Sequence, residues 1–149
     1  GWVYAALVRV LDEIPTDEKH RADYINDFLT MSKAIKNCQR TDGFWNVSMH
    51  DESNFGGKET SGTALFVYGM AWGGRNGLLD RKEYLPVLLK AWNAMVKDAV
   101  HPNGFLGLVQ GTGKEPKDSQ PVTYDKVPDF EDFGVGCFLL AGSEIYKLN

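Results

Sequence analysis

The segment KETSGTALFVYGMAWGGR, residues 58–75, decides the fold. No charged residue occurs between Thr60 and Gly74, and the segment is shorter than the ~20 apolar residues that a membrane-spanning helix needs. A helix that is apolar on every side has to be buried on every side. At its start Thr60 or Ser61 is expected to cap the free N–H groups, while Glu59 lies where the helix dipole favours an anion. The sequence therefore predicts a buried helix that begins at a polar rim.

Two further segments share this composition. Residues 1–8 (GWVYAALV) and 134–142 (GVGCFLLAG) both open with glycine and are apolar throughout. Their next charges come late, at Arg9 and Glu144. We interpret these segments as two more copies of the buried helix, which gives three in the chain.

Amphipathic helices are expected between the buried ones. The first is expected to start at a cap on Thr16, and the second at Asp80, which is followed three residues later by Glu83 in a capping-box arrangement. Apolar residues recur at helical spacing in both. They are Tyr24, Phe28, Met31, Ile35 and Cys38 in the first helix, and Leu85, Leu88, Trp92, Met95, Val96 and Ala99 in the second. Each helix should therefore bury one face and expose the other.

A glycine–phenylalanine loop follows each amphipathic helix. DGFWNV at 42–47 is echoed by NGFLGLV at 103–109, and FWNVSM at 44–49 alternates in the manner of a short strand. The order buried helix, amphipathic helix, loop, buried helix thus occurs twice, which is typical of stacked or ring-like helical hairpins. Residues 111–132 are rich in proline, glycine and charge, and we expect an ordered excursion over one rim. Loops of this length are usually functional or disordered, and the sequence leaves both open.

Buried helices inside and amphipathic helices outside describe an α/α toroid. Three inner and two outer helices make an incomplete ring, so we predict an all-α chain in which residues 1–149 form a single partial domain, with short strands in the rim loops. An open arc leaves apolar helix flanks unpaired. We therefore expect either a missing part of the ring in a longer protein or self-association of this chain.

Composition excludes some partners and cofactors. The chain has 149 residues and a net charge of -4 with no stripe of lysine and arginine, which argues against a nucleic-acid surface. Cys38 and Cys137 lie far apart and belong to no cluster with metal-ligand spacing, so we expect two buried thiols, no metal and no cofactor. No signal peptide is visible and the first residue is glycine, so the compartment stays open between cytoplasm and periplasm.

Four stretches carry a family resemblance: GWVYAALVRVLDEIP (1–15), DGFWNVSMHDES (42–53), ETSGTALFVYGMAWGGRNGLL (59–79) and VPDFEDFGVGCFLLAGSEIYKL (127–148). Together they resemble the C-terminal half of the unsaturated rhamnogalacturonyl hydrolases of glycoside hydrolase family 105. That family is related to the unsaturated glucuronyl hydrolases of family 88. In these enzymes the segment similar to 1–15 follows an Arg-Gly-Asn turn.

The resemblance implies roughly the second half of an (α/α)6 barrel and a carbohydrate hydrolase that takes part in pectin degradation. Such an enzyme hydrates the C4=C5 double bond of a terminal unsaturated uronic acid, unlike glycosidases that use two carboxylates. One Asp protonates C4 and activates the water that adds at C5, and the hemiketal then opens. The resemblance places that Asp before the Arg-Gly-Asn turn, so we expect no catalytic residue in this chain and no activity of the chain alone.

Six residues are candidates for contact with an oligosaccharide: Trp2, Trp45, His50, Glu59, Thr60 and Ser61. The two tryptophans can stack on a sugar face, and the histidine lies beside carboxylates. The last three match the polar entry to an inner helix, where free N–H groups can hold a carboxylate or a hydroxyl. Core packing, a solvated loop and plain helix capping explain the same residues without a ligand. The run GTGKE at 111–115 lacks the spacing of a phosphate-binding loop.

Other functions stay open on this sequence. The chain is also compatible with a catalytically inactive helical scaffold, or with part of another α/α-toroid glycosidase or polysaccharide lyase. A glycosidase with two acids needs two carboxylates that converge on one pocket, and this chain offers only loop candidates. Which unsaturated uronide is the substrate depends on groups from both halves of the ring.

Overall fold

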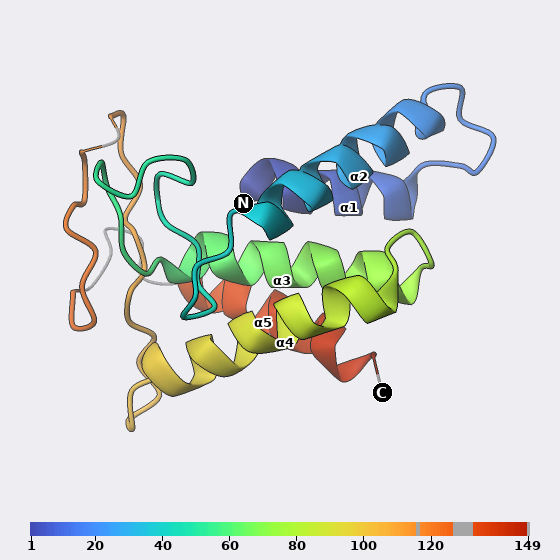
Figure 1. Cartoon of the computed structure of the whole chain (residues 1–149). Coiled ribbons are helices and arrows are strands. Elements are labelled where there is room, and N and C mark those ends of the chain that lie inside the picture. The colour runs from blue at the N-terminus through green and yellow to red at the C-terminus, as the bar shows by residue number, and fades with distance from the viewer. Residues whose placement is uncertain (116, 127–132, 149) are drawn as a thin grey trace.

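The computed structural model describes residues 1–115, 117–126 and 133–148, and these residues form five α-helices (Figure 1). The helices are α1 (Trp2–Glu13), α2 (Arg21–Asn37), α3 (Thr60–Arg75), α4 (Arg81–Asp98) and α5 (Phe133–Tyr146). The described ranges contain no strand. The strand expected at 44–49 is wrong, because pairing there is limited to one isolated bridge between Trp45 and Glu59. Much of the excursion expected at 111–132, including Phe130, lies outside the described residues.

Helix α3 lies at the centre of the fold, as the sequence predicted. α1 and α2 lie on one side of it, and α4 and α5 on the other (Figure 1). Every residue from Thr60 to Gly74 except Gly62 is buried. The prediction of an all-α chain with a buried central helix is therefore confirmed.

Glycines in α3 permit close contact with the aromatic side chains of its neighbours. The Tyr4 ring lies against Gly69 and stacks on Phe28, with the ring centroids 5.1 Å apart. Phe28 in turn lies against Gly73. Its ring packs edge-to-face with that of Trp72, with the ring centroids 5.4 Å apart. Because a glycine has no Cβ, the ring of α1 can approach the backbone of α3 directly. This layer of rings joins α1 and α2 to the central helix.

The two outer helices start differently. Asp80 caps α4 as predicted, since its Oδ1 accepts a hydrogen bond of 2.8 Å from the backbone N–H of Lys82. The start predicted at Thr16 is wrong, because α2 begins at Arg21 and no side chain caps it. The guanidinium of Arg21 donates at 3.0 Å to the carbonyls of both Leu11 and Ile14. These bonds satisfy carbonyls at the C-terminal end of α1, so the turn between the helices is longer than the capping signal indicated.

The first and last helices carry apolar surface that is not buried. Trp2 in α1 is 61% exposed and Leu139 in α5 is 64% exposed, although the segments 1–8 and 134–142 are as apolar as α3. Val3, Val135 and Leu140 are exposed as well. Only α3 has neighbours on both sides among the described residues, which is why burial on every side holds for α3 and fails for α1 and α5. The unpaired flanks expected of an open arc are therefore present.

We expect Gly69→Ala to lower the free energy of unfolding by about 1–3 kcal/mol, the usual cost of extra atoms in a packed core. An added Cβ would stand 2.2 Å from Tyr4 Cε1, and that ring is held by Phe28. Denaturant unfolding measures the change. Gly74→Ala in the same helix is the matched control, because the nearest atom to its new Cβ is 3.6 Å away. Equal effects of the two changes would contradict the close approach.

Candidate functional site: a cleft at the start of the central helix

The two glycine–phenylalanine loops share one hydrogen-bond pattern. In the first, the N–H of Arg40 donates to the carbonyl of Phe44 at 2.9 Å; in the second, the N–H of His101 donates to that of Phe105 at 2.8 Å. The turn in each is closed by a glycine with positive φ, 96° at Gly43 and 86° at Gly104, a conformation that favours glycine. The repeat seen in the sequence is therefore a repeat of structure, and it places two similar loops at one rim of the arc.

Glu59 connects this rim to the start of α3. One carboxylate oxygen accepts hydrogen bonds from the N–H of Ser61 (2.8 Å), from its hydroxyl (2.7 Å) and from the N–H of Gln110 (3.2 Å). The other accepts from the N–H of Gly62 at 2.6 Å. Glu59 is therefore the N-cap of α3, in place of the cap expected from Thr60 or Ser61. Its negative charge lies at the positive end of the helix dipole.

A cleft of about 370 Å³ opens beside this cap. Its walls come from the start of α1, the first rim loop, the first turns of α3, the segment after the second loop and the start of α5. The described residues that line it are Gly1, Trp2, Trp45, Asn46, Val47, Met49, Glu59, Ser61, Gly62, Thr63, Leu65, Phe66, Gln110, Gly111, Thr112, Gly113 and Phe133. The lining is mixed, with aromatic and aliphatic surface beside hydroxyl, carboxamide and backbone groups, which suits a neutral polar ligand such as a sugar.

Four of the six predicted site residues line this cleft: Trp2, Trp45, Glu59 and Ser61. Trp2 is the exposed aromatic among them, and its ring lies 6.3 Å from that of Phe133. Trp2 therefore has a ring surface open to a ligand, and its contact with a sugar stays a prediction. Ser61 lies in the wall with its hydroxyl bonded to Glu59.

Trp45 is packed in the core, and the stacking of a sugar on its ring stays a prediction. Its side chain is 1% exposed, its indole N–H donates to the carbonyl of Ile35 at 2.7 Å, and its ring meets the edge of Phe66 at 5.2 Å. The backbone N–H of Trp45 donates to the hydroxyl of Thr63 at 3.2 Å. These contacts favour core packing as the role of Trp45, beside the cleft that it helps to line.

Two predicted residues do not line the cleft. Thr60 is completely buried, its hydroxyl donates to the carbonyl of Gly107 at 2.9 Å and its N–H to that of Leu108 at 2.8 Å. These bonds join the start of α3 to the second rim loop, and substrate contact by Thr60 stays a prediction. His50 is exposed in the first loop, away from the cleft lining, so the structure does not bring it to the other candidates.

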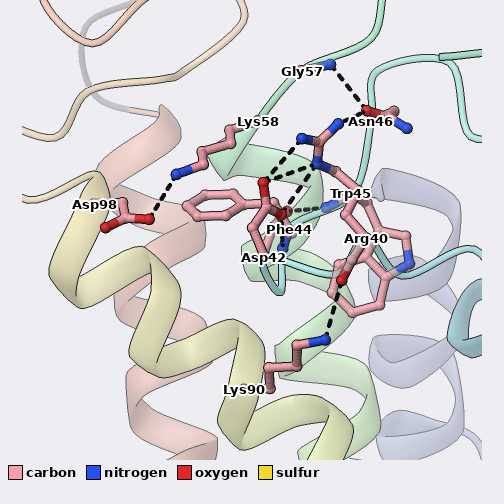
Figure 2. A network of polar contacts seen from close by, with 10 residues as sticks. Arg40, Asp42, Phe44, Trp45, Asn46, Gly57, Lys58, Lys90 and Asp98 are labelled. Atoms are coloured by element: carbon pink, nitrogen blue, oxygen red, sulfur yellow. Dashed lines mark hydrogen bonds and ion pairs between the residues drawn. The ribbon is translucent and has the colours of Figure 1, made fainter.

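A network of ion pairs lies behind the first rim loop (Figure 2). Arg40 donates to both oxygens of Asp42, at 2.9 Å from Nη2 and at 3.1 and 3.2 Å from Nε. It also donates to Oδ1 of Asn46. The hydrogen bond to Asp42 raises the pKa of Arg40. Burial acts to raise the pKa of Asp42, but hydrogen bonds from Arg40 and from the N–H of Phe44 outweigh it and lower that pKa.

A second ion pair crosses from the first loop to α4. Lys58 Nζ donates to Asp98 Oδ2 at 2.7 Å and lies 5.4 Å from the centre of the Phe44 ring. Lys90 Nζ reaches the carbonyl of Arg40 at 3.3 Å (Figure 2). The rim loop is therefore fixed to α4 by two lysines, which gives the cleft a rigid outer wall.

Sequence reasoning missed Asn46 and the segment 110–113 as parts of the cleft. Asn46 follows Trp45 directly, and of the two only the tryptophan was named from the sequence as a candidate for sugar contact. The sequence left a functional role open for the whole loop 111–132 but did not single out residues 110–113, which the bond from the Gln110 N–H to Glu59 draws to the cleft. The available signal was glycine, which permits close approach of a ligand to the backbone, and Gly1, Gly62, Gly111 and Gly113 all line the cleft.

Within the described ranges, no three His, Cys, Asp or Glu residues gather closely enough to hold a metal ion. Across the same ranges, no helix combines the length and the hydropathy that a bilayer crossing requires.

Comparison with known proteins gives concordant matches. The profile described as Glycosyl Hydrolase Family 88 matches residues 1–149. A curated relative from Formosa agariphila, named "Unsaturated 3S-rhamnoglycuronyl hydrolase", is 40% identical over 148 residues, which are 99% of this chain and 37% of that protein. The chain thus spans little more than a third of the length of this relative.

Solved structures agree on the fold. "Glycosyl hydrolase family 88 from Bacteroides vulgatus" matches with a TM-score of 0.91 at 40% identity, over 99% of this chain and 42% of that one. A structure named as a polysaccharide lyase matches with a TM-score of 0.87 at 41% identity, over 98% and 40%. A possible member of family GH105 from Salmonella enterica, at 23% identity and a TM-score of 0.80 over 98% and 38%, shares the fold. The family 88 matches confirm the predicted relationship to that family, and the GH105 structure shows the same α/α-toroid fold.

We expect Glu59→Gln to lower the free energy of unfolding by about 1–3 kcal/mol, the cost of leaving buried hydrogen-bonding groups unpaired. The glutamine NH2 group would replace an acceptor that now serves N–H and O–H donors only. Thermal or denaturant unfolding checks this. Glu52→Gln, at an exposed position, is the control and should change stability by less than about 0.5 kcal/mol. A loss no larger than that of the control would show that the cap is dispensable.

Cys137 is expected to resist thiol reagents at pH 8, while Cys38 reacts. Burial, followed by the negative charge of Glu59, raises the pKa of Cys137 to about 11, so its thiol keeps its proton at pH 8. The thiolate is the reactive form, and it therefore forms at Cys137 only as the pH approaches that value. Cys38 is partly exposed. Mass spectrometry after labelling of the native protein measures both sites, and equal labelling at pH 8 would contradict the buried position of Cys137.

Proposed function

Because the chain belongs to Glycosyl Hydrolase Family 88, we propose that it is part of a longer carbohydrate hydrolase that acts on unsaturated uronyl oligosaccharides. The observation that carries this proposal is the 40% identity, across 99% of the chain, to a relative named as an unsaturated 3S-rhamnoglycuronyl hydrolase. That name favours an unsaturated uronate linked to rhamnose as the substrate. A role in pectin degradation is tested below with pectin-derived disaccharides.

The proposed reaction is hydration of the C4=C5 double bond of the terminal unsaturated uronate. A carboxylic acid protonates C4, water adds at C5, and the resulting hemiketal opens to release the adjoining sugar. Such an acid has to exchange a proton with its substrate. Glu59 is the one carboxylate among the described cleft residues, and four donors surround its two oxygens. A carboxylate has about four lone-pair sites, so little capacity for proton transfer remains. This supports a catalytic acid that lies outside the described cleft.

The exposed flanks support the proposal of a longer ring. A free protein rarely exposes large contiguous apolar surface, and Trp2, Val3, Leu139 and Leu140 lie on the two helices at the ends of the arc. Further inner helices packed against α1 and α5 would bury these side chains. The same helices would complete the cleft, because Trp2 of α1 and Phe133 of α5 already form part of its wall. The alternative is that a second copy of this chain covers these flanks.

A polysaccharide lyase is the second candidate, favoured by the name of one similar structure. The two reactions have opposite signatures. A lyase that acts by β-elimination creates the conjugated C4=C5 double bond and raises ultraviolet absorbance, whereas the proposed hydrolase consumes the bond and lowers absorbance. One assay therefore separates them.

We expect the longer protein to lower the ultraviolet absorbance of unsaturated disaccharides, and this chain alone to leave it unchanged. Parallel arms use an unsaturated uronate linked to rhamnose, pectin-derived disaccharides and glycosaminoglycan disaccharides, each followed with time. Rising absorbance with intact polysaccharide would contradict the proposed hydrolase and support a lyase. No change with any arm would favour the inactive scaffold, and turnover by this chain alone would show that it contains the catalytic acid.

A further inference from the structure

Asn46 lies between two cavities. It lines the cleft at the start of α3, and it also lines a second cavity of about 360 Å³ behind the first rim loop. The second cavity is bounded by the end of α2 and the turn after it, where Asn37 and Arg40 lie. Nothing in the sequence motifs or in the comparisons assigns a role to Asn46. Its hydrogen-bond partners determine the directions in which its carbonyl oxygen and its NH2 group point.

The orientation follows from the two partners of Oδ1. One is the guanidinium of Arg40, and the other is the backbone N–H of Gly57 at 2.9 Å. Both partners can only donate, so the carbonyl oxygen has to face them and the NH2 group has to face the other way. Figure 2 shows Oδ1 between these donors and Nδ2 on the opposite side. Nδ2 makes no hydrogen bond within the described ranges, so the asparagine has its donor end available for another partner.

Arg40 is itself held in place. Its guanidinium makes three hydrogen bonds to Asp42, and Asp42 Oδ1 accepts a further one from the N–H of Phe44 at 3.2 Å. Bidentate pairing of this kind fixes direction as well as position. Because the hydrogen bond to Asp42 also raises the pKa of Arg40, the guanidinium stays charged. The donor end of Asn46 is thus pre-oriented before any ligand arrives.

The charge of the cleft indicates which part of a substrate lies here. Among its described lining residues there is no lysine, arginine or histidine side chain, and the one charged side chain is the carboxylate of Glu59. Glu59 also occupies the N–H groups at the start of α3 that would otherwise attract an anion. A uronate carboxylate is therefore disfavoured in this part of the cleft. A neutral sugar is favoured, because carboxamides, hydroxyls and backbone groups pair with its hydroxyls.

We propose that Asn46 Nδ2 donates a hydrogen bond to an oxygen of the neutral sugar attached to the unsaturated uronate, and that Arg40 is a positioning residue for this bond. The inference rests on the proposed function and adds where the leaving sugar binds. Asn46 is then a determinant of substrate specificity, with no part in the proton transfer.

The test is Asn46→Asp in the longer protein. Aspartate keeps an oxygen for Arg40 and Gly57, replaces the donor by an acceptor and adds a negative charge. We expect KM for an unsaturated disaccharide to rise roughly tenfold with little change in kcat, as for loss of a hydrogen bond that serves binding alone. Asn37→Asp is the matched control, because Asn37 lines only the second cavity. Asn46→Ser serves as a second variant without added charge, and it should raise KM less.

Positioning by Arg40 is tested by Arg40→Lys, which keeps the charge and loses the planar fork. We expect this variant to raise KM, and we expect the double variant with Asn46→Asp to be no worse than Asn46→Asp alone, because the two changes remove one interaction. Additive effects would leave Arg40 a purely structural residue and overturn its positioning role.

The outcomes separate the two proposals. An unchanged KM in both Asn46 variants, or an equal rise in Asn37→Asp, would overturn the role of Asn46 while the hydrolase stands. If the wild-type protein turns over no unsaturated uronide, the role of Asn46 is tested by calorimetry, which measures binding of the disaccharide of unsaturated uronate and rhamnose. Weaker binding by Asn46→Asp would then keep the inference without the proposed reaction, and equal binding would overturn both.

Discussion

The structure depends on how the backbone N–H groups in the first turn of α3 are paired. α3 is buried along nearly its whole length, so the unpaired donors of its first turn need a partner inside the protein. Glu59 supplies both oxygens to the N–H groups of Ser61 and Gly62. The same carboxylate accepts the N–H of Gln110 from the second rim segment. The helix cap and the wall of the cleft are therefore one hydrogen-bonded unit.

The two rim loops show how a repeat can build walls with different roles. Both loops close their turn with the same backbone bonds, but their next residues diverge. Trp45 turns into the core and bonds Ile35, whereas Leu108, with a φ of 58°, redirects the chain so that its carbonyl accepts from Thr60. Positive φ at a leucine is uncommon and indicates a backbone held by its surroundings. The second loop therefore lies against the first, and Asn46 and Gln110 come to line the same cleft.

Features set by local sequence could be predicted, whereas those set by distant partners could not. The burial of α3, the cap at Asp80 and the repeated loops follow from short patterns, and the structure has all three. The start of α2 does not, because Arg21 bonds carbonyls of α1 and delays the helix. Trp2 and Trp45 illustrate the limit most clearly. Both are aromatic residues next to a polar rim, but a bond from Trp45 to Ile35 on another element decides that only Trp2 keeps an exposed ring. The orientation of Asn46 likewise depends on Arg40, which the Gly43 turn brings beside it.

The remaining difference between sequence and structure concerns neighbours. The segments 1–8, 60–74 and 134–142 are alike in their apolar composition, and only α3 is enclosed by other described helices, so the exposed apolar surface of α1 and α5 has no local explanation. Burying apolar surface stabilises a fold by about 25 cal/mol per Å², which selects such residues only where a neighbour covers them. The exposed side chains of α1 and α5 are therefore the surface that the proposed longer ring would cover. Trp2 and Phe133 of the same two helices line the cleft, so in that proposal the covering helices would also shape the cleft.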